Sequence, residues 1–185
     1  MNPNLEIEYK MMISEENYLK LMKIYQKEPF FQRNIYYDAQ IPLVKKGMGM
    51  RIRDYDGKHL FTLKEKTTTG HFEYEVFTQE NSLKALEEKE VQAILKQLDI
   101  HGPFIETGIL DTWRVEIACE NGILCLDKNK YSDIIDYELE FELYPKANLE
   151  LGKKELETIL NQVELIYIQN KNSKIKRCLD ARRKK

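Results

Sequence analysis

Charged and apolar residues alternate along several short stretches of this chain, and most stretches carry charges of a single sign. Acidic pairs of the form Glu-x-Glu recur in separate stretches, whereas Arg-x-Arg and Lys-x-Lys pairs occupy others. A period of two is typical of β-strands, because successive side chains of a strand point to opposite faces. The alternating stretches are residues 6–10, 51–53, 61–64, 72–76, 112–117 and 137–143.

Two more strands are predicted at about residues 32–38 and 122–128, which brings the predicted number to about eight. Amphipathic helices are predicted for residues 14–26, 81–98 and 153–163, and the basic segment at about 172–185 is expected to be helical or tail-like. No stretch rich in Pro, Gly or Ser divides the 185 residues. Residues 1–185 are therefore expected to form a single domain.

Two architectures could use strands that are apolar on one face and charged on the other. In a sandwich the apolar faces form the core and the charges face water. Solubility alone, however, does not require charges that are sorted by sign from strand to strand. The alternative is a barrel with its charged face inward and its apolar face covered by the helices. We therefore predict an α+β fold, a closed antiparallel eight-stranded β-barrel with a charged interior and helices outside.

A charged interior of this kind predicts which ligands it could hold. Acidic strands that face basic strands offset part of the cost of removing charges from water. Carboxylate oxygens favour hard cations such as Mg²⁺, Mn²⁺ or Ca²⁺, and Arg and Lys favour phosphate oxygens. An interior with both kinds of group suits a complex of a divalent metal with a polyphosphate.

The overall composition argues against several other classes of protein. A formal net charge of −2 gives no reason to expect a nucleic acid or an acidic membrane as partner. The three cysteines form no Cys-x-x-Cys pair and do not cluster with the three histidines, which argues against zinc. No secretion signal or apolar stretch of transmembrane length is present, so a cytoplasmic location with reduced thiols is expected.

The charged motifs also follow a particular order along the chain. The order is Glu6-Ile7-Glu8-Tyr9-Lys10, Tyr36-Tyr37-Asp38, Met50-Arg51-Ile52-Arg53, Thr62-Leu63-Lys64, Glu73-Tyr74-Glu75, Arg114, Leu126-Asp127 and Glu138-Leu139-Glu140. Over residues 4–180 this order resembles the CYTH proteins, also called triphosphate tunnel metalloenzymes, and it looks closest to the small stand-alone members of Gram-positive bacteria. The family includes class IV adenylate cyclases, thiamine triphosphatases and inorganic triphosphatases. The resemblance implies an eight-stranded tunnel and metal-dependent chemistry on triphosphates.

The resemblance also implies roles for individual residues. The implied catalytic residues are Glu6, Glu8, Lys10, Glu138 and Glu140. The implied ligands of Mg²⁺ or Mn²⁺, with Ca²⁺ as an inhibitor, are Glu6, Glu8, Asp127, Glu138 and Glu140. The implied phosphate ligands are Lys10, Arg51, Arg53, Lys64, Arg114 and Lys174. Lys66 is added to them because it shares a strand face with Lys64. Glu73 and Glu75 would complete the acidic lining, and Glu142 is expected to be structural.

One position departs from the family pattern and leaves the preferred substrate open. Many bacterial members carry Lys-x-Arg where this chain has Thr112-Trp113-Arg114. The implied activity is hydrolysis of a triphosphate, either inorganic tripolyphosphate or an organic or nucleoside triphosphate. One alternative is adenylate cyclase activity, which needs a pocket for the base that the sequence does not identify. Another is a non-catalytic polyphosphate-binding or nucleotide-binding module, which would not need so many carboxylates.

Overall fold

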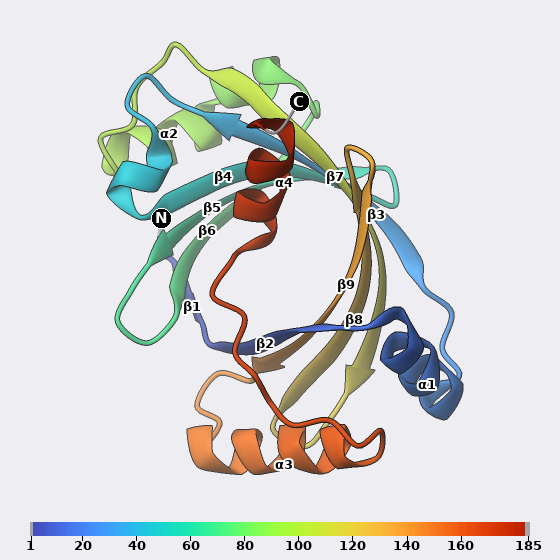
Figure 1. The fold of residues 1–185 in the computed structure, drawn as a ribbon. Coiled ribbons are helices and arrows are strands. Elements are labelled where there is room, and N and C mark those ends of the chain that lie inside the picture. The colour runs from blue at the N-terminus through green and yellow to red at the C-terminus, as the bar shows by residue number, and fades with distance from the viewer. Residues whose placement is uncertain (1, 184–185) are drawn as a thin grey trace.

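Nine antiparallel strands within residues 2–183, the part of the chain that this computed structural model describes, form one sheet (Figure 1). The strands are β1 (Asn4–Glu6), β2 (Glu8–Ile13), β3 (Phe30–Asp38), β4 (Met48–Tyr55), β5 (Lys58–Lys66), β6 (His71–Thr78), β7 (Ile105–Ala118), β8 (Gly122–Tyr131) and β9 (Ile134–Leu143). Their spatial order is β1-β6-β5-β4-β3-β7-β8-β9-β2. Met1 and residues 184–185, which belong to the predicted domain and the predicted C-terminal segment, lie outside the described residues.

The N-terminal stretch joins the two edges of this sheet. β1 pairs with β6 at one edge, β2 pairs with β9 at the other, and only Ile7 separates β1 from β2. The carbonyl of Ile7 still accepts a hydrogen bond of 2.9 Å from the Leu143 amide. The predicted barrel is therefore confirmed, with nine strands in place of eight, because the single strand predicted at residues 6–10 is broken where it passes from β6 to β9.

Gly70, directly before β6, allows β1 to approach this strand closely. A Cβ atom at this position would lie 2.1 Å from the carbonyl oxygen of Glu6. Any side chain there would force the two strands apart, since no real Cβ contact is that short. Glycine at this position thus places Glu6 directly opposite His71 in the β1–β6 ladder.

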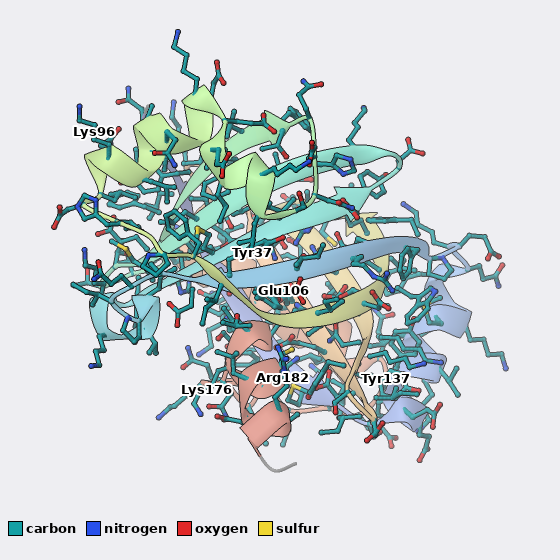
Figure 2. The ribbon with its side chains drawn as sticks, turned by 90° about the horizontal axis from the view of Figure 1, so that it is seen from above. Tyr37, Lys96, Glu106, Tyr137, Lys176 and Arg182 are labelled. Carbon is teal, nitrogen blue, oxygen red and sulfur yellow. The ribbon has the colours of Figure 1, made fainter. Side chains whose placement is uncertain are left out.

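Three helices cover the outside of the barrel. They are α1 (Glu15–Tyr25), α2 (Lys89–Gln97) and α3 (Leu149–Asn161), and the 3-10 turns η1 (Leu43–Lys46) and η2 (Leu83–Glu87) accompany them. The helix predicted for residues 81–98 is divided into η2 and α2 because Glu88 between them is extended, with φ −64° and ψ 143°. Lys96 on the outer side of α2 points away from the barrel (Figure 2).

Two apolar clusters lie between these helices and the outward faces of the strands. The first joins α2 to β4, β5 and β6, and the second joins α1 and α3 to β7, β8 and β9. Ile94 of α2 is fully buried in the first cluster together with Phe61, and Leu156 of α3 is fully buried in the second together with Phe141. The apolar faces thus point outward under helices, as predicted, and the inward faces are left to the charged residues.

The C-terminal helix α4 (Lys174–Arg183) takes a different position from the others. The chain that leads from α3 to α4 crosses the opening of the barrel, and α4 lies over that opening (Figure 1). Cys178 packs with Tyr36, Leu110 and Tyr131. Arg182, which is labelled on α4 in Figure 2, donates to the Thr107 carbonyl on β7. α4 therefore brings charged side chains to the interior.

Within the described residues, no helix has the length and apolar character needed to cross a membrane.

Candidate active site

The inward-facing charged residues form three groups, and the first lies where β1, β2, β5 and β6 meet. Lys64 Nζ lies 2.6 Å from a carboxylate oxygen of Glu6 and 2.6 Å from one of Glu73. Lys10 Nζ lies 2.6 Å from Glu8 on the same strand. Burial opposes the charge of Lys64, but Glu6 and Glu73 outweigh it and raise the Lys64 pKa. Each of the two N-terminal carboxylates is thus held by a lysine.

His71, which the sequence analysis did not select, belongs to this first group. A carboxylate oxygen of Glu6, a carboxylate oxygen of Glu8 and a ring nitrogen of His71 all lie within 4.8 Å of one another. The Nδ1 atom of His71 is buried and has no hydrogen-bond partner among the described residues. Burial and the nearby Lys64 lower the pKa of His71, which favours the neutral imidazole. The signal for His71 was present in the sequence, since it shares the alternation of Glu73 on the same strand.

The second group contains two arginines on β4. In the described part of the chain, neither Arg51 nor Arg53 has an ion-pair partner within 4 Å, and Arg51 Nε is buried without a hydrogen-bond partner. Arg53 donates to the neutral Asn34 side chain at 3.0 Å. Burial, together with repulsion from Arg51 and Arg114, lowers the pKa of Arg53 to about 10. This side of the interior therefore carries positive charge that no carboxylate among residues 2–183 neutralises by an ion pair within 4 Å.

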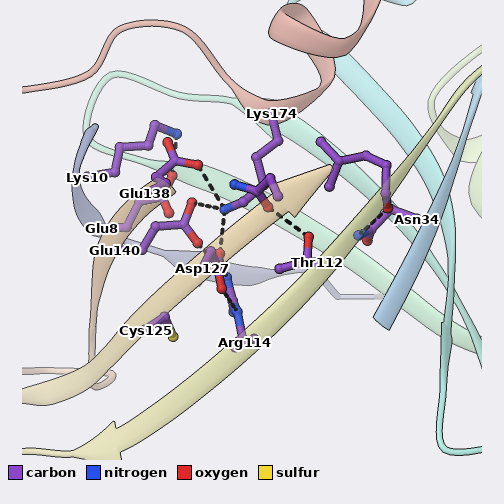
Figure 3. A network of polar contacts seen from close by, with 12 residues as sticks. Glu8, Lys10, Asn34, Thr112, Arg114, Cys125, Asp127, Glu138, Glu140 and Lys174 are labelled. Carbon is purple, nitrogen blue, oxygen red and sulfur yellow. Dashed lines mark hydrogen bonds and ion pairs between the residues drawn. The ribbon is translucent and has the colours of Figure 1, made fainter. Parts of the chain in front are cut away.

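The third group lies between β7, β8, β9 and α4 (Figure 3). Arg114 donates to both carboxylate oxygens of Asp127 at 2.8 Å, to Glu140 at 2.6 Å and to Glu142 at 3.1 Å. Asp127 is fully buried, as is Glu138 nearby. Glu142, expected to be structural, thus faces the interior with the other carboxylates. It shares the alternation of Glu138 and Glu140 on β9, which could have identified it.

Lys174 reaches from α4 into these carboxylates. Its Nζ lies 2.6 Å from Glu140, 2.9 Å from Asp127 and 3.1 Å from Glu138 (Figure 3). Burial opposes ionisation of Glu140, but Lys174 and Arg114 outweigh it and hold the Glu140 pKa well below its ordinary value. The pKa of Asp127 is lowered in the same way, against burial, by Arg114 and Lys174. With Glu6 and Glu8 held by lysines of the first group, all five predicted metal ligands are therefore paired with protein cations in this structure.

Arg177, one turn after Lys174, extends this group and was not predicted. It contacts Asp136 and Glu138, each at 2.9 Å. Asp136 follows the same alternation along β9 as the glutamates, which is the signal that could have identified it. For Arg177 the i, i+3 spacing from Lys174 on α4 is the corresponding signal, because such residues share a helix face.

The other predicted site residues occupy different surroundings. Glu75 faces inward and accepts a hydrogen bond of 2.9 Å from the Thr62 hydroxyl. Lys66 is solvent-exposed at the end of β5, and within the described residues no ion pair joins it to the three groups. Thr112 is fully buried and donates to the Asn129 side chain at 2.8 Å (Figure 3). At position 112, where the resemblance implies a lysine, the side chain that faces the interior therefore carries no charge.

Comparisons with known proteins match nearly the whole chain. Residues 4–179 match the family model of the CYTH domain. The whole chain is 31% identical to the Bacillus subtilis (strain 168) protein named "Putative triphosphatase YjbK", and it covers 99% of that protein. A crystal structure from Bacillus halodurans, described as that of "a putative adenylate cyclase", is 32% identical with a TM-score of 0.82, and the match covers 96% of this chain and 98% of the other.

A structure of HpAC1 from Hippeastrum has the same fold. It is 21% identical, its TM-score is 0.76, and the match covers 96% of each chain. The matches to the family and to both Bacillus proteins extend over nearly the whole length of the chain. The residues matched by the family model, 4–179, include the nine strands of the barrel and the charged motifs on its inner face. The chain therefore belongs to the CYTH domain family.

Proposed function

We propose that this protein is a divalent-metal-dependent triphosphatase, which hydrolyses a phosphoanhydride bond of a triphosphate inside the barrel. The observation that carries the proposal is the pair Arg51 and Arg53, two inward guanidinium groups without an ion-pair partner among the described residues. Guanidinium groups bind phosphate oxygens through paired hydrogen bonds. The name of the B. subtilis relative, which matches over its full length, supports the same activity.

The first group of charged residues fits a divalent metal ion. Two ligands on opposite sides of an ion, with bonds of about 2.0–2.3 Å, are about 4.0–4.6 Å apart. The ligand atoms of Glu6, Glu8 and His71, all within 4.8 Å of one another, could therefore hold one ion after small adjustments. When bound, a divalent ion would neutralise charge that develops on the phosphate oxygens during hydrolysis.

The protein's own residues would bind and orient the substrate. Arg51 and Arg53 would hold the phosphates. Lys10 and Lys64, each 2.6 Å from a carboxylate of the proposed metal site, would become free to donate to phosphate when the ion takes over those carboxylates. Water would then add to a phosphorus in line with the leaving phosphate, and a carboxylate of the interior would accept the water proton. Asp127, Glu138 and Glu140 could join the site only by exchanging Lys174.

A substrate panel tests this proposal. Every group assigned above addresses phosphate or metal, and none addresses a base or a thiazolium ring. We therefore expect inorganic tripolyphosphate to be hydrolysed with Mg²⁺ or Mn²⁺, alongside ATP and thiamine triphosphate. Phosphate release and cyclic AMP should be measured separately, because the B. halodurans structure is described as that of "a putative adenylate cyclase". A protein that makes cyclic AMP from ATP and leaves tripolyphosphate intact would contradict the proposal.

Replacing Glu6 by glutamine should abolish metal-dependent turnover without unfolding the protein. The change keeps the shape of the side chain but removes a charged ligand, so we expect kcat/KM to fall by about 100-fold or more at a fixed metal concentration. Folding should persist because Lys64 keeps its contact of 2.6 Å with Glu73. Glu16→Gln on the exposed face of α1 is the control. Unchanged activity of Glu6→Gln at limiting metal would exclude Glu6 as a ligand.

A further inference from the structure

We infer that His71 is a nitrogen ligand of the divalent ion held by Glu6 and Glu8, and that this ligand makes the site favour Mn²⁺ or Co²⁺ over Mg²⁺. The inference rests on the proposed function for the presence of the ion. It adds a residue, and a preference among metals, that the carboxylate motifs alone do not supply.

The strand arrangement brings the three side chains together. Glu6 lies directly opposite His71 in the β1–β6 ladder, and Gly70 permits the close approach of these strands. Glu8 follows the break at Ile7 and begins β2. Among the described residues, Glu6, Glu8 and His71 form a group of three potential metal ligands. One ligand atom of each lies within 4.8 Å of the other two. The three donors thus come from three strands that meet only in the closed barrel.

The ring of His71 has an unused polar atom in this location. Its Nδ1 is buried and makes no hydrogen bond within the described residues, and one of its two ring nitrogens lies within 4.8 Å of carboxylate oxygens of Glu6 and Glu8. Buried polar atoms normally have a partner, and each exception calls for a physical explanation such as an ion. By contrast, His59 on β5 is satisfied by Asp54 at 2.5 Å, and His101 by Asp99 at 2.8 Å.

The charge of the group also matches a divalent ion. Glu6 and Glu8 carry two negative charges, which Lys10 and Lys64 neutralise from 2.6 Å each. One divalent ion supplies the same charge as the two lysines, so the exchange would leave the local charge balance unchanged. The imidazole contributes a ligand without altering that balance.

The composition of the ligands decides which metal is favoured. Mg²⁺ strongly prefers oxygen ligands and an octahedral shell that includes several waters. Imidazole nitrogen binds first-row transition metals well, and affinity for a mixed nitrogen and oxygen site rises from Mn²⁺ to Co²⁺ and beyond. A site of two carboxylates and one imidazole should therefore discriminate against Mg²⁺ more than a site of carboxylates alone.

Pulsed electron paramagnetic resonance of the Mn²⁺-loaded protein tests this inference directly. Wild-type protein should show the ¹⁴N modulation of an imidazole bound to Mn²⁺. His71→Gln should lose that modulation, and the control His101→Gln should keep it, since His101 lies in an exposed loop. Titration calorimetry should show that His71→Gln weakens Mn²⁺ binding by at least about tenfold and changes Mg²⁺ binding much less.

Three results would overturn the inference. They are wild-type protein that does not bind Mn²⁺, bound Mn²⁺ without ¹⁴N modulation, and modulation that persists in His71→Gln. If His71→Gln does not fold, the presence or absence of the wild-type modulation decides. Hydrolysis of tripolyphosphate without ¹⁴N modulation would reject His71 as a ligand and leave the proposed function standing. A clear nitrogen signal in a protein that hydrolyses no triphosphate would reject the proposed function and leave His71 as a ligand of the ion.

Discussion

Replacing Arg51 by alanine is expected to lower kcat/KM for every triphosphate by about 100- to 1,000-fold, the usual effect of removing one preorganised donor to a transition state. The loss should be similar for tripolyphosphate, ATP and thiamine triphosphate, because the phosphate contact is common to all three. Stability should not fall, because Arg51 has no ion-pair partner among the described residues, and its buried Nε has no hydrogen bond to lose. Burying an unpaired charge is itself unfavourable.

Arg33→Ala is the matched control for this variant. Arg33 is also an arginine of the sheet, but it lies on the surface and binds Asp111 through hydrogen bonds of 2.7 and 2.9 Å. Tripolyphosphate should raise the melting temperature of wild type and Arg33→Ala, since a ligand that binds only the folded state stabilises it. It should have little effect on Arg51→Ala. Equal stabilisation of Arg51→Ala and wild type would exclude Arg51 as a phosphate ligand.

Arg114→Ala, unlike Arg51→Ala, should destabilise the fold. We expect it to lower the free energy of unfolding by about 3–5 kcal/mol at pH 7, the usual cost of breaking a buried ion pair. Arg114 is buried and contacts Asp127, Glu140 and Glu142, so its removal leaves buried carboxylates with too little positive charge. Arg33→Ala breaks an ion pair of similar geometry at the surface and should cost only about 0–1 kcal/mol. Urea denaturation of both variants gives the comparison.

The pH dependence of that deficit identifies its cause. In wild type the folded-state pKa values of Asp127 and Glu140 are lowered, against burial, by Arg114 and Lys174. Their contribution to stability is thus complete above the unfolded pKa of about 4 and is lost as the pH falls through the folded pKa. Without Arg114, burial is opposed mainly by Lys174, and these folded-state pKa values should rise above the unfolded value, so that protonation relieves the variant as the pH falls from 7 to 4. The deficit of Arg114→Ala should therefore shrink between pH 7 and pH 4, and an equal deficit at both would assign it to lost packing.

Local sequence patterns, with their charges sorted by sign, predicted the barrel and most of the charged side chains that line it. Alternation with a period of two is set within each strand, because neighbouring side chains point to opposite faces. It therefore identified Glu138 and Glu140 as inward, with apolar Leu139 between them on the outer face. The same rule applied to β6 and β9 would have added His71 and Glu142.

Tertiary structure alone decided which of these side chains meet. The pairing of Glu6 with His71 depends on the register between strands far apart in the chain, and no local pattern contains that register. The contacts of Lys174 with Asp127 and Glu140 depend likewise on where α4 docks, which is set by packing against Tyr36 and its neighbours inside the barrel. The sequence by itself determined the charged lining of the interior, whereas the partners of each charge came from long-range packing.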